Sequence, residues 1–403
     1  MACSNKFCIL PWIHAHVLPT GDVVQCCAVE VGSTSLGNVK QKSLEEIWND
    51  DGFKAIRRKM IDGVAVEACK VCYSAEDAGG TSLRTKSNHD FAQHLNLVNI
   101  TQADGSISEF KLRYYDVRFS NLCNLHCRMC CPELSSSVAN DWAIMNNLPK
   151  PRILDVYKSR EEFLRDFAPH VSSLEEIYFA GGEPLLIDAH YWALEELLRQ
   201  GKKNLRLRYN TNFTILGKGS WFAPDLWKHF PTIEIGASLD ADGDRIEYIR
   251  QGIKWNKILE NREIIRKETP HADFRVAVTV GVMNLLHVPE FLRNCVEENF
   301  TRPDGFFTNN LLFPNYFSSQ ILPKEWKQRA REEYALLIEY MRDKGSPEWI
   351  LMNVGSVIRN MDLANREDLL PSFFRATTRL DTLYKKKFFE TFPEYKSLEK
   401  SLK

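Results

Sequence analysis

The chain has 403 residues, of which 44% are hydrophobic, and its formal net charge at pH 7 is −1. This length supports a large buried core, and the balanced charge excludes the bulk electrostatics typical of nucleic-acid or acidic-membrane binding. No apolar run approaches the roughly 20 residues that cross a bilayer, and the amino terminus lacks the pattern of a secretory signal. We therefore expect a cytoplasmic protein with no membrane or nucleic-acid partner.

Residues 1–80 are predicted to form a small module rich in cysteine and turn residues. Apolar arms on both sides of Thr20, Gly21 and Asp22 predict a β-hairpin over residues 17–27. Apolar residues at helical spacing follow Ser43, which suits an N-cap position because Glu46 comes three residues later. Residues 81–110 are polar and contain glycine, and we interpret them as a linker and loop.

From residue 111 onward, predicted strands and helices alternate. Such alternation is typical of right-handed βαβ units and a parallel sheet. Six units within residues 111–315 predict an α/β fold with a partial (β/α)6 barrel, because a complete eight-unit barrel needs about 250 residues. Residues 316–403 show helical spacing, and we expect a helical C-terminal extension. The predicted barrel strands lie at 112–119, 174–180, 204–212, 232–240, 272–282 and 304–314.

The eleven cysteines indicate metal binding. Without an export signal, clustered cysteines more often bind metal or carry out redox chemistry than form disulfides. Directly after the first barrel strand, Cys123, Cys127 and Cys130 have the spacing C-x3-C-x2-C. A [4Fe–4S] cluster has four irons, usually held by four thiolates, so three cysteines leave one iron open to chelate a substrate. Cys131 is an alternative fourth ligand, and a zinc site completed by His126 is a second alternative.

This cysteine loop, placed at the end of a barrel strand, resembles the signature of the radical S-adenosylmethionine superfamily. The resemblance covers residues 111–315 and extends to the segments YFAGGEPLL, NTNF, ASLDA, EYIRQG and VTVGVMN. It implies that the three cysteines hold a [4Fe–4S] cluster and that the open iron binds S-adenosylmethionine. It also implies that Arg250 binds the methionine carboxylate and that Val282 or Met283 packs near the adenine. The other implied cofactor contacts are Gly181, Gly182, Glu183, Asn212, Ser238 and Met129.

A second group of four cysteines lies in the N-terminal module: Cys8, Cys26, Cys69 and Cys72. With Gly21 they form C-x12-G-x4-C followed by C-x2-C, a spacing that allows four thiolates to close around one cluster. A zinc ribbon has a similar pattern, and Cys27 is an alternative ligand to Cys26. His14 and His16 alternate on one face of an extended arm, and we expect them to pack or to lie at the surface.

Over residues 6–75, the N-terminal module resembles the auxiliary-cluster module called SPASM, or its shorter twitch form. No further cysteines follow Cys72 before Cys123, so the resemblance implies one auxiliary [4Fe–4S] cluster. The module usually follows the barrel in the chain, whereas here it precedes the barrel.

Together, the resemblances imply an enzyme whose 5′-deoxyadenosyl radical abstracts hydrogen from a peptide or protein substrate. Such an enzyme needs an external one-electron donor of the flavodoxin or ferredoxin kind. One alternative is a twitch-type dehydrogenase or mutase that acts on a sugar, a cyclitol or a nucleotide. Another is a non-catalytic metal or electron-transfer protein.

Overall fold

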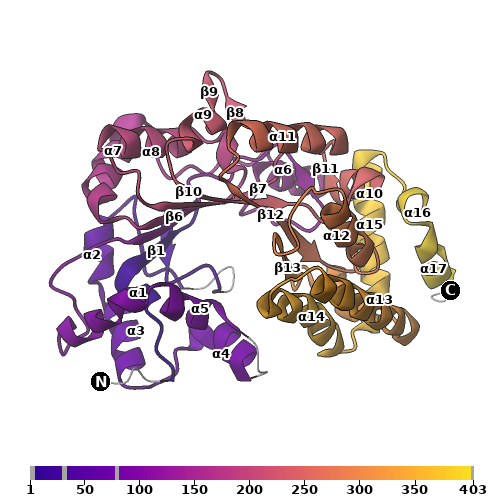
Figure 1. Ribbon diagram of the computed structural model, residues 1–403, viewed down its shortest axis with the longest axis horizontal. Coiled ribbons are helices and arrows are strands. Elements are labelled where there is room, and N and C mark those ends of the chain that lie inside the picture. Colours follow the sequence, from indigo (N-terminus) through magenta and orange to yellow (C-terminus); the bar gives the residue numbers. More distant parts are fainter. Residues whose placement is uncertain (1–4, 30–33, 78–80, 401–403) are drawn as a thin grey trace. The chain divides into compact units, whose positions relative to one another are not determined.

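The computed structural model describes residues 5–29, 34–77 and 81–400, so Cys3 lies outside the described residues (Figure 1). The chain forms two compact units. The first contains residues 1–122, 153–209 and 217–233, and the second contains residues 123–152, 210–216 and 234–403.

The first unit contains a mixed sheet in which the N-terminal module and the barrel segment share strands. Strand β1 pairs in parallel with β4, with His14 opposite Tyr114, and antiparallel with β2. The predicted hairpin is therefore confirmed, and its first strand extends the parallel sheet of β4, β6 and β7. The strand order is β7 (Arg206–Thr211), β6 (Glu176–Phe179), β4 (Tyr114–Val117), β1 (His14–Val17), β2 (Asp22–Val24) and β3 (Gly37–Asn38).

Helices α7 (Arg160–Phe167) and α8 (Asp188–Arg199) cover one face of this sheet (Figure 1). Successive side chains of a strand point to opposite faces, and the apolar positions of β4, β6 and β7 share the face under these helices. Ring contacts join the layers: Tyr115 lies 6.4 Å from Phe167, and Phe179 stacks on Tyr209 at 5.1 Å. The opposite face of the sheet carries the polar positions, among them Asp116 and Arg118.

The interpretation of residues 81–110 as a linker and loop is wrong for residues 83–100. These residues form α5 (Leu83–Asp90), which Ser82 and Thr85 start with a reciprocal capping box, and the 3-10 segment η2 (Ala92–Ile100). Few apolar residues mark α5 in the sequence, because polar contacts hold it in place. The other helices of the N-terminal module are α1 (Leu10–Ile13), α2 (Leu44–Trp48), α3 (Asp51–Ile61) and α4 (Lys70–Asp77), with η1 (Glu67–Cys69).

Helix α2 begins where the sequence predicts. Ser43 accepts a hydrogen bond from the backbone of Glu46, whose side chain accepts one from the backbone of Ser43. This capping box satisfies two amide groups that the helix itself leaves free. Leu44, Ile47 and Trp48 are buried by the helix.

The second unit holds three parallel strands: β10 (Thr232–Ser238), β12 (Asp273–Val280) and β13 (Phe306–Asn310). Helices α11 (Trp255–Glu268) and α12 (Val288–Glu297) alternate with them in the predicted order. The C-terminal region is helical, as expected, and Asn353 of α14 accepts a hydrogen bond of 2.7 Å from the backbone of Thr308. Its helices are α13 (Lys324–Asp343), α14 (Glu348–Asp362), α15 (Leu370–Tyr384), α16 (Phe388–Thr391) and α17 (Lys396–Lys400).

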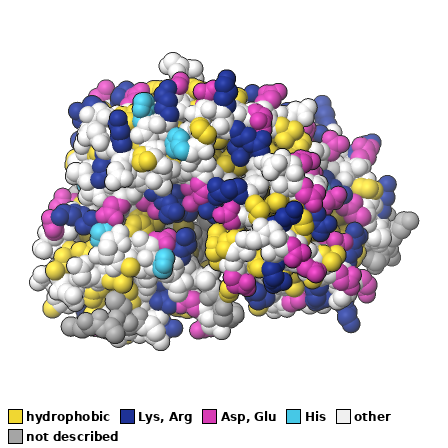
Figure 2. All heavy atoms as spheres, in the orientation of Figure 1, with side chains coloured by type: hydrophobic (Ala, Val, Ile, Leu, Met, Phe, Trp, Pro, Cys, Tyr) yellow, Lys and Arg dark blue, Asp and Glu magenta, His cyan; other side chains and the backbone are white. Residues whose placement is uncertain are grey.

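The α/β class, the parallel strands and the helical C-terminal region are thus confirmed. In the described part of the chain, none of the helices has the length and apolar character that crossing a membrane requires. Figure 2 shows Lys and Arg side chains interspersed with Asp and Glu over the visible face, in agreement with the net charge of −1.

Candidate functional site

The cysteine loop of the second unit is held at both ends. Strand β5 (His126–Cys127) pairs antiparallel with β11 (Arg250–Gln251), which places Arg250 opposite Cys127. At the start of helix α6 (Ser136–Met145), Ser136 accepts a hydrogen bond from the Cys123 amide, and the neighbouring Ser137 donates to its carbonyl. The backbone of Cys123 and that of Cys127 are therefore fixed by different neighbours.

The thiols of this loop lie close enough to influence one another. Burial raises the pKa of Cys127 to about 12, and nearby Cys123 contributes to the rise. A hydrogen bond with Cys131, together with burial, raises the pKa of Cys130 well above its usual range. Without a metal these thiols hold their protons, whereas bound irons supply the positive charge that stabilises thiolates. The buried thiols of this loop therefore suit the binding of an iron–sulfur cluster.

Arg250 is a fixed cation beside the loop. Its Nη1 lies 3.8 Å from the Sγ of Cys127, and its Nε lies 2.7 Å from the Oδ2 of Asp240. Asp240 is fully buried and also accepts a 2.8 Å hydrogen bond from the Thr279 amide. Although burial lowers the pKa of Arg250, the Asp240 carboxylate raises it above its ordinary value. Sequence reasoning did not give Asp240 a role, although Asp240 lies within the quoted segment ASLDA.

Asn212 braces the same loop. Its Nδ2 donates to the Oδ1 of Asn124 at 2.8 Å, and its Oδ1 accepts from the amide and hydroxyl of Thr214. Asn124 in turn donates to the Thr214 hydroxyl at 2.9 Å. Because Asn124 follows Cys123 directly, this network orients the first part of the cysteine loop.

The remaining predicted contacts of the second unit are placed as follows. Ser238 is the last residue of β10 and is half-buried, and Met129 is half-buried within the loop. Val282 and Met283 are buried. The Val282 amide donates to the Phe317 carbonyl at 2.8 Å, and the Val282 carbonyl accepts from the Tyr395 hydroxyl.

Helix α15 holds the cysteine loop from the C-terminal region. Arg128, fully buried between two motif cysteines, forms a 2.6 Å ion pair with Asp381. Its guanidinium lies 3.6 Å from the centre of the Tyr248 ring, in helix α10 (Gly243–Ile249). These contacts were not predicted from the sequence.

A second contact from α15 reaches His126, the residue considered as a zinc ligand. The His126 Nδ1 lies 2.6 Å from the Oδ2 of Asp141, which also accepts a 2.7 Å hydrogen bond from the Tyr384 hydroxyl. The carboxylate therefore orients the His126 ring through Nδ1, a contact that zinc-bound and purely structural histidines share.

In the first unit, the glycine–glycine–glutamate segment follows β6. A Cβ atom on Gly182 would lie 2.1 Å from the Leu122 carbonyl oxygen, so this position admits no side chain. The Gly182 amide donates to the Ser120 carbonyl, and the Glu183 amide donates to the Leu122 carbonyl at 2.7 Å. Glu183 is fully buried, and its carboxylate accepts a hydrogen bond from the Leu185 amide. The glycines therefore fix the backbone that leads into the cysteine loop.

The polar face of the first unit's sheet carries a buried ionic network that sequence reasoning missed. Asp116 is fully buried between His16 at 2.9 Å and Arg118 at 2.6 Å. Burial opposes ionisation, but Arg118 and His16 lower the pKa of Asp116 below its usual range. The guanidinium groups of Arg118 and Arg208 each lie 5.0 Å from the Tyr178 ring centre.

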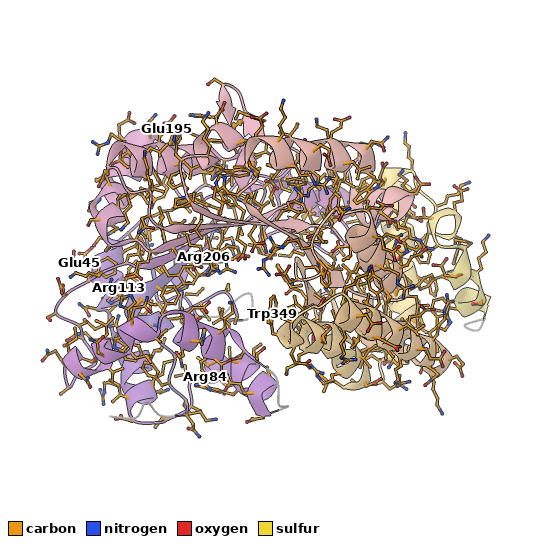
Figure 3. The ribbon with its side chains drawn as sticks, viewed as in Figure 1. Glu45, Arg84, Arg113, Glu195, Arg206 and Trp349 are labelled. Atoms are coloured by element: carbon orange, nitrogen blue, oxygen red, sulfur yellow. The ribbon has the colours of Figure 1, made fainter. Side chains whose placement is uncertain are left out.

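A second row of this network lies two residues earlier along each strand, on the same face of the sheet. Arg208 and Arg206 pair with Glu176 at 2.9 and 3.5 Å, and Figure 3 labels Arg206. His14 is buried against the Tyr114 ring. We expected His14 and His16 either to pack inside the protein or to lie at the surface, and both are buried. The alternation of polar residues in 114–118 and 206–208 is the signal that marks this face.

The four N-terminal cysteines named as a group line one cavity. Cys8, Cys26, Cys69 and Cys72 meet there, and Arg84 also lines the cavity. Burial raises the pKa of Cys8 to about 12 and that of Cys69 to about 11. In the described residues, no group of three His, Cys, Asp or Glu side chains forms a site for a single metal ion.

Cys27 has different surroundings from Cys26. The Cys27 side chain is exposed, whereas that of Cys26 is buried. Cys27 does not line the cavity of the four cysteines. The geometry therefore groups Cys26, and not Cys27, with Cys8, Cys69 and Cys72.

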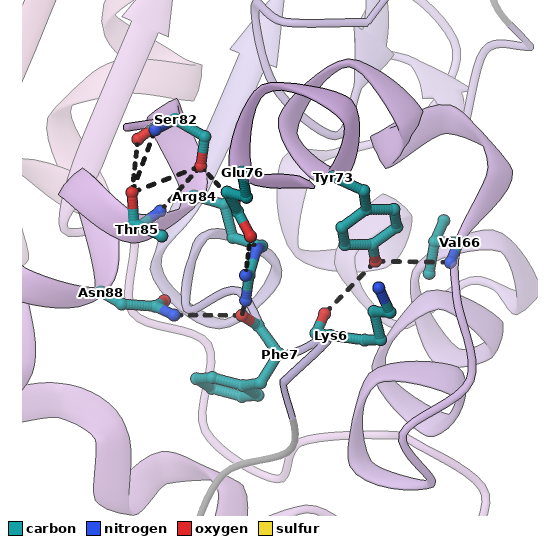
Figure 4. Close-up of polar contacts among 9 residues, drawn as sticks. All are labelled: Lys6, Phe7, Val66, Tyr73, Glu76, Ser82, Arg84, Thr85 and Asn88. Carbon is teal, nitrogen blue, oxygen red and sulfur yellow. Dashed lines mark hydrogen bonds and ion pairs between the residues drawn. The ribbon is translucent and has the colours of Figure 1, made fainter. Parts of the chain in front are cut away.

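Polar contacts hold the turn before Cys8 in place (Figure 4). Arg84 and Asn88 of α5 both donate to the Phe7 carbonyl, at 2.7 and 3.0 Å. Tyr73, which follows Cys72, donates its hydroxyl proton to the Lys6 carbonyl. Helix α5, missed in the sequence, is thus part of the support for the cysteine cavity.

The comparison with protein families addresses this module. Residues 8–73 match SPASM, an iron–sulfur cluster-binding domain. The match confirms the SPASM resemblance of the N-terminal module and supports an iron–sulfur cofactor there. A search of curated protein sequences finds no match for the chain.

Several solved structures are similar to the chain at low identity. Native anSMEcpe with bound AdoMet and Cp18Cys peptide is 16% identical, with a TM-score of 0.43, over 59% of this chain and 62% of that one. SuiB of Streptococcus suis bound to precursor peptide SuiA is 13% identical, with a TM-score of 0.42, over 70% and 60%. TYW1 with a lysine-pyruvate adduct is 14% identical, with a TM-score of 0.32, over 58% and 72%. The chain spans less than two thirds of anSMEcpe and SuiB, and at these scores none of the likenesses assigns an activity.

Proposed function

We propose that the chain is a radical S-adenosylmethionine enzyme with one auxiliary iron–sulfur cluster. The observation that carries the proposal is the loop of Cys123, Cys127 and Cys130, which presents three thiols beside the Arg250 guanidinium. A [4Fe–4S] cluster held by these three cysteines would supply one electron to the sulfonium of S-adenosylmethionine, so that the S–C5′ bond breaks, methionine leaves and a 5′-deoxyadenosyl radical remains for hydrogen abstraction.

The residues around the loop have distinct roles in this proposal. Arg250 offers its Nη atoms to the methionine carboxylate while Asp240 holds its Nε. Asn212 fixes the orientation of Asn124, and with it the first part of the cysteine loop, by a hydrogen bond. The backbone at Gly181 and Gly182 binds the methionine ammonium, because glycine lets carbonyl groups approach a ligand closely. Glu183, Ser238 and Met129 complete the cofactor contacts.

The auxiliary cluster is assigned to Cys8, Cys26, Cys69 and Cys72. Two observations support it: the four side chains line one cavity, and the surrounding residues 8–73 match the SPASM domain. Four thiolates satisfy all four irons of a [4Fe–4S] cluster, so this cluster has no open iron for a substrate. The role proposed for it is therefore electron transfer, and the binding of S-adenosylmethionine is left to the cluster of the loop.

The proposed substrate is a peptide or protein, because SPASM-type modules often accompany enzymes that modify ribosomally made peptides. A small-molecule dehydrogenase or mutase is the second candidate. The favoured class predicts deuterium transfer from a labelled peptide into 5′-deoxyadenosine. A sugar, cyclitol or nucleotide that transfers deuterium when no peptide does would establish the second candidate.

Anaerobic iron and sulfide analysis with electron paramagnetic resonance (EPR) tests the cluster assignment. The wild type is compared with the triple variant Cys123→Ala/Cys127→Ala/Cys130→Ala, each with and without S-adenosylmethionine. We expect about eight irons in the wild type and about four in the triple variant, with a wild-type signal that S-adenosylmethionine perturbs. About four irons in the wild type, all lost in the triple variant, would remove the auxiliary cluster from the proposal.

A further inference from the structure

The outer side of α15 forms an open groove with α16 and α17. Helices α15 and α16 contact each other and are neighbours in Figure 1. The groove encloses about 540 Å³, and the half-buried rings of Phe374 and Phe389 line it, with ring centres 6.0 Å apart. It lies wholly within the second unit.

The rim of this groove is basic. Lys386, Lys387 and Lys396 are exposed and line it, and Glu390 is the one exposed acid among the lining residues. Glu390 is already paired with Lys387 at 2.8 Å. An acid close to Lys386, Glu247, is paired with Lys254 at 2.6 Å. The rim therefore presents a net positive charge to a partner.

The inner side of the same helix reaches the cysteine loop. Asp381 lines the groove and also holds Arg128 at 2.6 Å, and Arg128 stands between Cys127 and Cys130 in the sequence. Asp381 accepts further hydrogen bonds from the Tyr248 hydroxyl and the Phe388 amide. Its charge is thus compensated inside the protein, and a short chain of packed side chains joins the groove to the loop.

We propose that this groove docks the one-electron donor of the enzyme, an acidic redox protein of the flavodoxin or ferredoxin class. The inference rests on the proposed function, because the cluster on the loop needs the electron before it can reduce S-adenosylmethionine. The donor is oxidised by one electron and the loop cluster is reduced by one, with no bond formed or broken. Basic rims steer acidic partners and give weak, salt-dependent interfaces, as electron transfer between proteins requires.

The lysines also have a purely structural explanation. Cations near the carboxyl end of a helix are stabilised by its dipole, and Lys386 and Lys387 follow the end of α15. The dipole of α15 does not account for the aromatic groove, nor for the exposed Lys396, which lies on α17. The two explanations differ in what charge reversal does to donor binding.

The test compares the triple variant Lys386→Glu/Lys387→Glu/Lys396→Glu with a matched control, Lys257→Glu/Lys267→Glu/Lys324→Glu. The control residues are exposed lysines of the same unit outside the groove. Titration calorimetry measures the affinity of the holoprotein for a purified flavodoxin of net negative charge. Measurements at about 50 and about 250 mM salt report the electrostatic part of the affinity. 5′-Deoxyadenosine formation is measured with reduced flavodoxin and separately with dithionite.

We expect the groove variant to bind flavodoxin about tenfold more weakly than the control and to lose most of its salt dependence. Its flavodoxin-driven rate should fall similarly, while its dithionite-driven rate should match that of the control. Equal flavodoxin affinities for the two variants would overturn the docking proposal. A wild type that forms no 5′-deoxyadenosine with dithionite would instead refute the proposed function, and the calorimetric comparison would still decide whether flavodoxin binds the groove.

Discussion

Arg128 and Asp381 form an ion pair of 2.6 Å across 253 positions of the chain, and the Arg128 side chain is fully buried. Removing one partner of a buried pair leaves an uncompensated charge, which costs about 3–5 kcal/mol. We predict that Asp381→Ala lowers the free energy of unfolding by about 3 kcal/mol, measured by anaerobic urea denaturation.

The control for this prediction is Asp362→Ala. Asp362 pairs with Arg331 at 2.8 Å, but both side chains are more than a third exposed. Exposed pairs contribute about 0–1 kcal/mol, so this variant should differ little from the wild type. Similar losses in the two variants would show that the buried pair has no special role.

Substitution of Arg250 tests the cofactor contact. Lysine keeps the positive charge but loses the planar guanidinium that contacts Asp240 through Nε and Cys127 through Nη1. We predict that Arg250→Lys weakens S-adenosylmethionine binding about tenfold, measured by the cofactor-induced change in the EPR signal. Arg245→Lys is the control, since Arg245 lies in α10, shortly before Arg250 in the chain, and pairs with Glu394 instead. Unchanged binding in Arg250→Lys would contradict the assigned contact.

Gly182 tests the backbone support of the cysteine loop. An alanine Cβ would lie 2.1 Å from the Leu122 carbonyl oxygen, so the backbone just before Cys123 would have to move. We predict that Gly182→Ala loses most of the iron bound at the loop after anaerobic reconstitution. Gly201→Ala should keep its iron, because nothing lies within 4 Å of a Cβ there, although its φ of +71° adds local strain. Full iron retention in Gly182→Ala would show that the loop tolerates the displacement.

His14 gives a prediction about pH. Burial lowers the pKa of His14 from 6.5 to about 3, so the folded protein holds this ring neutral. Below pH 6.5, the ordinary pKa of about 6.5 means that His14 is protonated in the unfolded chain but stays neutral in the folded chain. The unfolded state therefore binds more protons, and the free energy of unfolding falls as pH falls. Between about pH 7.5 and about pH 5.5 this one group lowers the free energy of unfolding by about 1.4 kcal/mol.

The variant His14→Gln removes the contribution of His14 to the pH dependence of stability. We predict that its stability changes with pH by about 1.4 kcal/mol less than that of the wild type over the same interval, measured by urea denaturation. Parallel pH profiles for the two proteins would mean that His14 titrates normally in the folded chain.

The order of strands and helices in residues 111–315 was predictable because its signals are local. The period of apolar residues marks each strand, and the predicted strand over 232–240 contains β10. Local spacing likewise grouped Cys8 with Cys26, and both side chains line one cavity. The order of residues in the chain was enough for these features.

The contacts that support the cysteine loop were not predictable in this way. Asp381 lies 253 positions from Arg128, and Tyr384 lies 243 positions from Asp141, so no local spacing joins them. Helix α5 was missed because Arg84 and Asn88 hold it by polar contacts instead of an apolar stripe. Alternating polar residues such as Asp116 normally indicate a solvated strand face, whereas here that face is a buried ionic network.

The formation of 5′-deoxyadenosine from S-adenosylmethionine under reducing, anaerobic conditions tests the central claim most directly. It is measured in the wild type, in Cys127→Ala, and in Cys131→Ala as a control from the same loop. The account predicts 5′-deoxyadenosine from the wild type and from Cys131→Ala, and none above background from Cys127→Ala. Equal formation by Cys127→Ala and the wild type, or none by a wild type with its full iron content, would contradict it.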